Sequence, residues 1–116
     1  MNTLHKSERI CSKRDIEVLF GDGENFFRHP FKVFYKPNRL QFDRIIVSVR
    51  KRDFKRAVKR NLIKRRIRES YRLSKADVAG SVCYDIAFVY LANEILTFEK
   101  INEKIRECME RIRKSS

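Results

Sequence analysis

Acidic residues are scarce in this chain of 116 residues, which carries 15 Asp and Glu against 28 Lys and Arg and has a formal net charge of +13. No run approaches the ~20 consecutive apolar residues that would span a bilayer. The N-terminal stretch MNTLHKSERICSKRD has no hydrophobic signal-peptide core. We therefore expect a cytoplasmic protein without a membrane partner, and the excess of positive charge indicates a polyanionic ligand such as nucleic acid.

Metal ligands and catalytic side chains are also few. Cys11, Cys83 and Cys108 form no C-x-x-C pair and have no neighbouring histidine, which argues against zinc. We expect reduced thiols, with Cys83 and Cys108 buried. His5 and His29 lie in terminal or loop contexts, and the acids form no D-x-D cluster. The sequence thus predicts no protein metal site and no catalytic residue.

The hydrophobic content, 42% of residues with nine Phe and four Tyr, suffices for one domain spanning 1–116. We expect 1–10 and 113–116 to fray. Periodicity predicts the order α-β-β-α-β-α, an α+β fold (an α/β sandwich) in which helices cover a small mixed sheet. The predicted helices cover 12–20, 55–73 and a last segment capped by Thr97; the predicted strands cover 31–36, 42–49 and 82–91.

The first predicted helix and strand carry an apolar face each. Ser12 is the expected helix cap, and Gly21 and Gly23 are expected to end the helix. Along the strand, alternation places one set of side chains on one face and the other set on the opposite face. These sets are Phe31, Val33 and Tyr35, and Lys32, Phe34 and Lys36.

The segment from Arg50 to Arg72 holds twelve of the 28 basic residues and two of the 15 acidic ones, a net charge of +10. Apolar residues recur through it, so we expect a helix that buries one side. At 100° per residue, one arc roughly 100° wide holds five polar residues: Asn61, Lys64, Arg65, Arg68 and Arg72. Like charges on one ridge repel until phosphates neutralise them, so this ridge is predicted to bind a polyphosphate backbone. Asn61 either contacts a base edge or a 2′-OH, or caps local backbone.

The run RAVKRNLIKRRIRE at 56–69 resembles the signature helix of the bacterial ribonuclease P protein subunit, with its Arg-Asn-Arg box. IIVSVRKR at 45–52 is similar to the strand that precedes this helix in the family. The segments LFGDG, FKVFY, YDIAFVYL and FEKI match further family segments in the same order. The third position of the box, usually Arg, is Leu62 here; Lys59 or Arg66 can compensate.

The resemblance implies a ribosomal protein S5 domain 2-like fold with a left-handed βαβ crossover. It implies the protein component of an endoribonuclease that matures the 5′ end of tRNA, in which the RNA subunit and Mg²⁺ held mainly by that RNA carry out the hydrolysis. No obligate protein partner is implied. The surface for the catalytic RNA would comprise Lys51, Arg52, Arg56, Lys59, Arg60, Asn61, Lys64, Arg65, Arg68 and Arg72. A cleft for the single-stranded 5′ leader of precursor tRNA would be lined by Ile16, Phe20, Val33 and Tyr35.

Other functions fit parts of this pattern. Plain core packing is the alternative for Ile16 and Phe20. A small ribosomal-type structural RNA-binding protein would share the composition and the charge, but it has no need of the basic register together with an aromatic cleft. A self-sufficient nuclease would need a catalytic constellation that the sequence lacks. A DNA-reading helix-turn-helix would need a helix directly before the basic one, where a strand is predicted.

Overall fold

The computed structural model describes residues 12–38, 42–74 and 83–114. Three helices and four strands follow one another in these ranges. They are α1 (Lys13–Asp22), β1 (Glu24–Arg28), β2 (Phe31–Pro37), β3 (Arg44–Val49), α2 (Ala57–Ser74), β4 (Tyr84–Tyr90) and α3 (Phe98–Lys114). The predicted α+β class is confirmed, whereas the predicted element order omitted β1.

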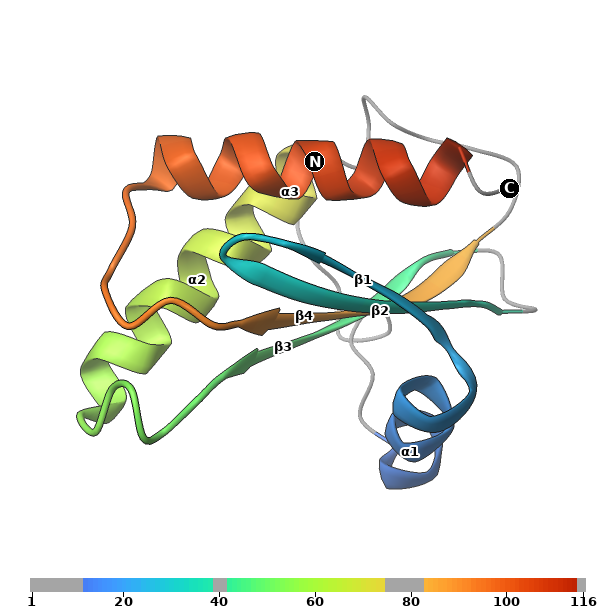
Figure 1. Ribbon diagram of the computed structural model, residues 1–116, viewed down its shortest axis with the longest axis horizontal. Helices are drawn as coiled ribbons and strands as arrows, with labels where there is room; N and C mark the ends of the chain where they lie inside the picture. Colours follow the sequence, from blue (N-terminus) through green and yellow to red (C-terminus); the bar gives the residue numbers. More distant parts are fainter. Residues whose placement is uncertain (1–11, 39–41, 75–82, 115–116) are drawn as a thin grey trace.

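The four strands form one mixed sheet in the order β1-β2-β4-β3. β2 pairs antiparallel with both β1 and β4, and β3 pairs parallel with β4. A parallel pair needs a crossover connection, which α2 provides here. Figure 1 shows α2 and α3 together over one face of the sheet, with α1 alone below the other face. The β3–α2–β4 unit that the family resemblance implies is therefore present.

The main core lies between the sheet and the pair α2–α3. Alternate residues of β2 are buried in it, namely Phe31, Val33 and Tyr35. They pack with residues from the inner sides of the two helices: Ile63, Ile67, Tyr71, Ile101, Ile105, Cys108, Met109 and Ile112. On the opposite face of the sheet a smaller cluster joins α1 to the strands through Leu19 and Ala87. The two faces therefore differ: one is closed by two helices and the other is covered only in part.

The ends of α1 follow from local contacts. Ser12 caps the helix as predicted, because its side chain accepts a hydrogen bond of 3.4 Å from the Asp15 N–H. Gly21 does not end the helix but lies inside it; Gly23 is the C-cap, with an extended φ of −74°. A Cβ on Gly23 would come 2.4 Å from the Leu19 carbonyl oxygen, so lack of space, not a left-handed backbone, requires glycine there.

Fraying was expected from 113 onward; α3 extends to Lys114, and Arg113 forms an ion pair with Asp43, the residue before β3. One expectation about the cysteines needs correction. Cys83 is only half-buried, since it lies just before β4 rather than inside the core, whereas Cys108 is buried as predicted. The expectations for 1–10, 115–116 and Cys11 lie outside the described residues. None of the helices in the described ranges is long and apolar enough to cross a bilayer.

Candidate nucleic-acid interface

Two sets of contacts fix the orientation of α2: its buried side packs toward the sheet, and Arg66 bonds the loop before α3. Ile63, Ile67 and Tyr71 are buried toward the sheet, as the periodicity predicted. The guanidinium of Arg66 donates a hydrogen bond of 2.6 Å to the carbonyl oxygen of Leu96, in the loop that leads to α3. This bond ties α2 to that loop.

The basic ridge of α2, defined as Asn61, Lys64, Arg65, Arg68 and Arg72, lies on the side away from the sheet. Asn61 and Arg65 are exposed, and the other three are half-buried. Among the described residues, Lys64 and Arg65 have no carboxylate partner. Arg72 does have one, because its guanidinium bonds the Glu69 carboxylate, lowers the pKa of Glu69 and has its own pKa raised. The Glu69 carboxylate therefore compensates the charge of Arg72 at the C-terminal end of the ridge.

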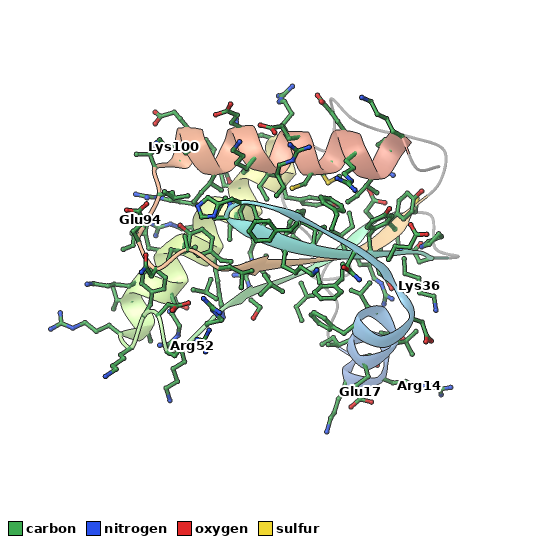
Figure 2. The ribbon with its side chains drawn as sticks, viewed as in Figure 1. Arg14, Glu17, Lys36, Arg52, Glu94 and Lys100 are labelled. Atoms are coloured by element: carbon green, nitrogen blue, oxygen red, sulfur yellow. The ribbon has the colours of Figure 1, made fainter. Side chains whose placement is uncertain are left out.

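Four more predicted cations extend the ridge at the N-terminal end of α2. They are exposed and, within the described ranges, have no carboxylate partner: Lys51, Arg52, Arg56 and Lys59. In Figure 2, Arg52 lies at the opposite end of the molecule from Arg14 and Glu17 of α1, and all three lie below the sheet. The cationic surface thus reaches from α2 around the end of β3 toward the face that α1 shares.

Arg60 has a second role that the sequence did not reveal. Its Nη1 donates hydrogen bonds to the carbonyl oxygens of Phe54, at 2.6 Å, and Lys55, at 3.0 Å. These carbonyls belong to the segment directly before α2. The Arg60 side chain therefore fixes that segment to the first turn of the helix. Only the spacing of five to six residues could have suggested this contact. Arg60 is therefore partly a structural residue.

The predicted cleft residues do not gather on one surface. Ile16 and Phe20 of α1 lie against Phe34, with the rings of Phe20 and Phe34 edge to face at a centroid distance of 4.6 Å. Val33 and Tyr35 lie on the other face of β2, where they are 0% and 7% exposed in the core under α2 and α3. The prediction that they line a cleft with Ile16 and Phe20 is wrong, because side chains of a strand alternate between faces and α1 packs on the face of Phe34.

The sheet face beside α1 carries aromatic, cationic and small side chains. Strand pairing aligns four residues across it, one from each strand: Phe27, Lys32, Val89 and Ser48. We call these four residues the open row. Its Lys32 ammonium lies 5.8 Å from the centroid of the Phe34 ring and donates a hydrogen bond of 2.9 Å to the Asn25 side chain. An aromatic surface next to a fixed cation suits single-stranded nucleic acid, whose bases stack while its backbone is neutralised.

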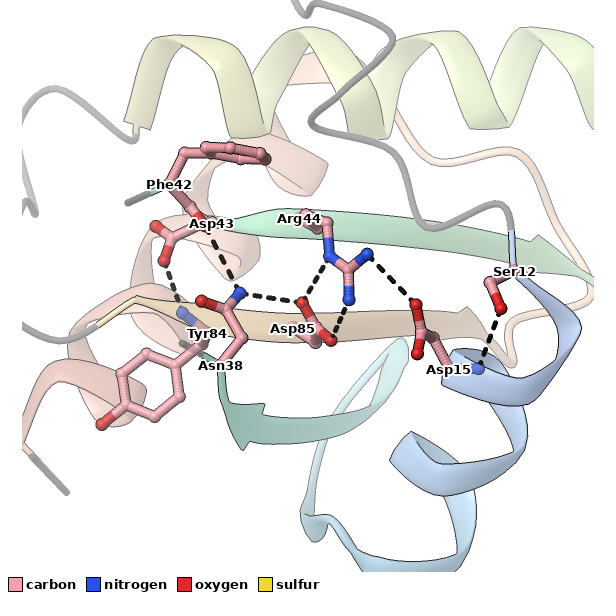
Figure 3. A network of polar contacts seen from close by, with 8 residues as sticks. All are labelled: Ser12, Asp15, Asn38, Phe42, Asp43, Arg44, Tyr84 and Asp85. Atoms are coloured by element: carbon pink, nitrogen blue, oxygen red, sulfur yellow. Dashed lines mark hydrogen bonds and ion pairs between the residues drawn. The ribbon is translucent and has the colours of Figure 1, made fainter. Parts of the chain in front are cut away.

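A polar network fastens α1 to this face (Figure 3). Arg44 of β3 donates two hydrogen bonds to Asp85 of β4, at 2.9 and 2.7 Å, and one of 3.2 Å to Asp15 of α1. The side chain of Asn38 adds a hydrogen bond of 2.8 Å to Asp85. The hydrogen bonding of Arg44 to the Asp85 carboxylate is the main reason that the pKa of Arg44 is raised, so the guanidinium keeps its charge. The helix α1, which borders the open row, is thus attached to the sheet by the Arg44–Asp15 ion pair as well as by the apolar packing of Leu19.

The fold and these two surfaces define a small basic α+β protein of the nucleic-acid-binding class. Residues 4–113 match the family described as Ribonuclease P. The chain is 36% identical to the ribonuclease P protein component of Porphyromonas gingivalis W83, over 94% of this chain and 85% of that one. It is 32% identical to the component of Thermotoga petrophila, over 92% and 93%. The chain therefore belongs to the ribonuclease P protein family.

Solved structures agree with this assignment. The RNase P protein from Thermotoga maritima matches with a TM-score of 0.78 and 26% identity, over 90% of this chain and 96% of that one. The Staphylococcus aureus RNase P protein matches with a TM-score of 0.77 and 27% identity, over 92% and 95%. The predicted role as the protein subunit of ribonuclease P, a ribonucleoprotein of tRNA processing, is confirmed, and none of these matches favours the ribosomal-type alternative.

Proposed function

We propose that the basic ridge of α2 and its N-terminal extension bind the catalytic RNA of ribonuclease P. The observation that carries this proposal is a set of six cations that have no carboxylate partner among the described residues: Lys51, Arg52, Arg56, Lys59, Lys64 and Arg65. A folded surface that leaves its positive charges uncompensated gains most from a ligand that brings phosphates, and each contact releases counterions. The Asn61 side chain is exposed and has no hydrogen bond to a described backbone group, so we assign it contact with a base edge or a ribose hydroxyl and not the capping role.

We further propose that the open row, together with Phe20 and Phe34, holds the single-stranded 5′ leader of precursor tRNA. In this proposal the buried Val33 and Tyr35, which were predicted to line the cleft, are replaced as leader contacts by side chains that solvent can reach. Phe20 and Phe34 offer ring surface for bases, and Lys32 neutralises phosphate beside them. The leader would thus lie on the face opposite to the core, bordered by α1.

In this proposal the RNA performs the hydrolysis and the protein positions the substrate, in the bacterial cytoplasm. We propose that the RNA holds most of the Mg²⁺; this is supported within the described ranges by the lack of any group of three His, Cys, Asp or Glu side chains that could hold a metal ion. The protein's contribution is binding energy and orientation, which raise the local concentration of a correctly placed leader.

The test combines the purified chain, a bacterial ribonuclease P RNA and a precursor tRNA at low Mg²⁺. We expect no cleavage by the chain alone and strong stimulation when the RNA is present. Cleavage by the chain alone would instead support a self-sufficient nuclease. Binding to the RNA without stimulation of cleavage would support a purely structural RNA-binding role.

A further inference from the structure

Phe27 is an aromatic side chain that the fold leaves in solvent. It lies on the edge strand β1 and is 55% exposed, against 38% for Phe20 and 37% for Phe42. Its neighbour Phe26 points the other way, is buried, and packs edge to face with Tyr35 at a centroid distance of 5.8 Å. Phe26 therefore supplies the core contact of β1. Among the described residues, the Phe27 ring contacts only the His29 ring, at a centroid distance of 6.3 Å, and it stays largely exposed.

The position of Phe27 makes it the outer end of the open row. The antiparallel register of β1 and β2 sets Phe27 directly opposite Lys32, on the face that carries Phe34. The Lys32 ammonium bonds the Asn25 side chain and lies 5.8 Å from the centroid of the Phe34 ring. Phe34 and Lys32 are two residues apart on β2, and Phe27 lies opposite Lys32 on the next strand, about 4.8 Å away, so two rings flank the position of one lysine on this face.

An exposed aromatic on an edge strand is unfavourable for a protein that only has to fold. Edge strands offer unpaired backbone groups to other chains, and apolar side chains on them promote association. A polyanionic ligand that stacks bases explains both the ring and the adjacent lysine, since either alone serves single-strand binding less well. Continuity with Phe34 identifies the same strand of RNA as the occupant.

We propose that Phe27, with Lys32, forms a second base-stacking position for single-stranded RNA, at the β1 edge of the sheet. This inference rests on the proposed leader surface and extends it by a position that only longer leaders reach. A base stacks on the Phe27 ring, and the phosphate next to it pairs with the Lys32 ammonium. The β1 edge would therefore determine how the complex responds to the length of the leader.

The experiment measures the affinity of the assembled protein–RNA complex for precursor tRNAs whose leaders increase in length. Phe27→Leu keeps an apolar side chain but removes the ring, and Phe27→Trp keeps a stacking surface. Phe42→Leu is the matched control, because Phe42 is also exposed but precedes β3. We expect Phe27→Leu to lose about 5-fold or more in affinity for long leaders alone. Phe27→Trp and Phe42→Leu should behave as the unsubstituted protein does.

Other outcomes separate the possible failures. If Phe27→Leu binds long leaders normally while Phe34→Ala loses its response to the leader, the second position is wrong and the leader surface stands. If neither variant alters the response to the leader, the leader surface itself is wrong. An equal loss on leaderless RNA would assign Phe27 a structural role. Self-association that Phe27→Leu abolishes without a change in leader affinity would assign the β1 edge to a second copy of the chain.

Discussion

Arg44 and Asp85 face each other across the parallel pair β3–β4 and are joined by two hydrogen bonds, of 2.9 and 2.7 Å. Both side chains are largely shielded, at 19% and 13% exposure. Because Arg44 also bonds Asp15, this pair links the sheet to α1, the helix that borders the proposed leader surface. The geometry of that surface therefore depends on an ion pair between two strands, outside the basic helix.

Replacing Arg44 by leucine should lower the free energy of unfolding by about 2 kcal/mol or more, because it leaves the shielded Asp85 carboxylate without its guanidinium partner. Urea unfolding would measure this loss. Arg14→Leu on the exposed side of α1 is the control and should stay within about 0.5 kcal/mol of the unsubstituted protein. Equal stability of the two variants would contradict the role given to the ion pair.

Arg60 and Arg65 should separate structural from RNA-binding roles. Arg60→Ala removes two hydrogen bonds to the backbone and should lower the free energy of unfolding by about 1–2 kcal/mol, besides weakening RNA binding. Arg65→Ala should leave stability within about 0.5 kcal/mol and reduce the salt dependence of RNA affinity by about 0.7–0.9 in log–log slope. Thermal melts and binding isotherms at several salt concentrations would test both, and an unchanged slope for Arg65→Ala would mean that the ridge is not the RNA surface.

Leu62 occupies the third position of the box, where the family resemblance implies Arg. It is half-buried on α2, one turn after the exposed Val58. Leu62→Arg should add one phosphate contact, which steepens the log–log salt slope by about 0.7–0.9 and tightens binding of the catalytic RNA at low salt. Leu62→Gln controls for the loss of the apolar side chain, and a gain equal to that of Leu62→Arg would refute the phosphate contact.

Phe34 and Tyr35 are adjacent in sequence and should respond in opposite ways. Phe34→Ala removes a ring from the leader surface and should reduce the affinity gained from a leader about 5-fold or more, with the fold retained. Tyr35→Ala empties a buried site and should lower the free energy of unfolding by about 3 kcal/mol. Circular dichroism melts together with affinities for leadered and leaderless substrates distinguish the two effects. If Phe34→Ala lowered only the stability of the fold and left the affinity for the leader unchanged, Phe34 would not belong to the RNA surface.

Burial raises the pKa of the Cys108 thiol to about 12, from an ordinary value of 9.0. The unfolded chain releases this proton first, so the associated stability is present below pH 9 and is lost as the pH rises toward 12. Cys108→Val should therefore show a shallower decline of stability than the unsubstituted protein above about pH 9. Urea midpoints over this range provide the comparison, and parallel declines would show that Cys108 does not contribute.

Local pattern was sufficient for the helices and for most strands. The 3.6-residue spacing of Ile63, Ile67 and Tyr71 identified the buried side of α2 and, by exclusion, its polar side. Ser12 and Thr97 marked helix starts because capping is a contact between residues three apart. The strand β1 escaped prediction because only Phe26 of its five residues is buried, so no alternation was visible in the sequence.

The sequence by itself determined that this chain has a cationic helix with one buried side, and that Val33 and Phe34 occupy opposite faces of one strand. Both properties follow from backbone periodicity, which is local. Only the tertiary structure decided which face meets α1 and which lies under α2 and α3, because this depends on strand pairing between distant segments. For that reason the proposed leader surface contains Phe34 and Lys32. The tertiary structure also showed that the Arg60 side chain bonds the backbone before α2.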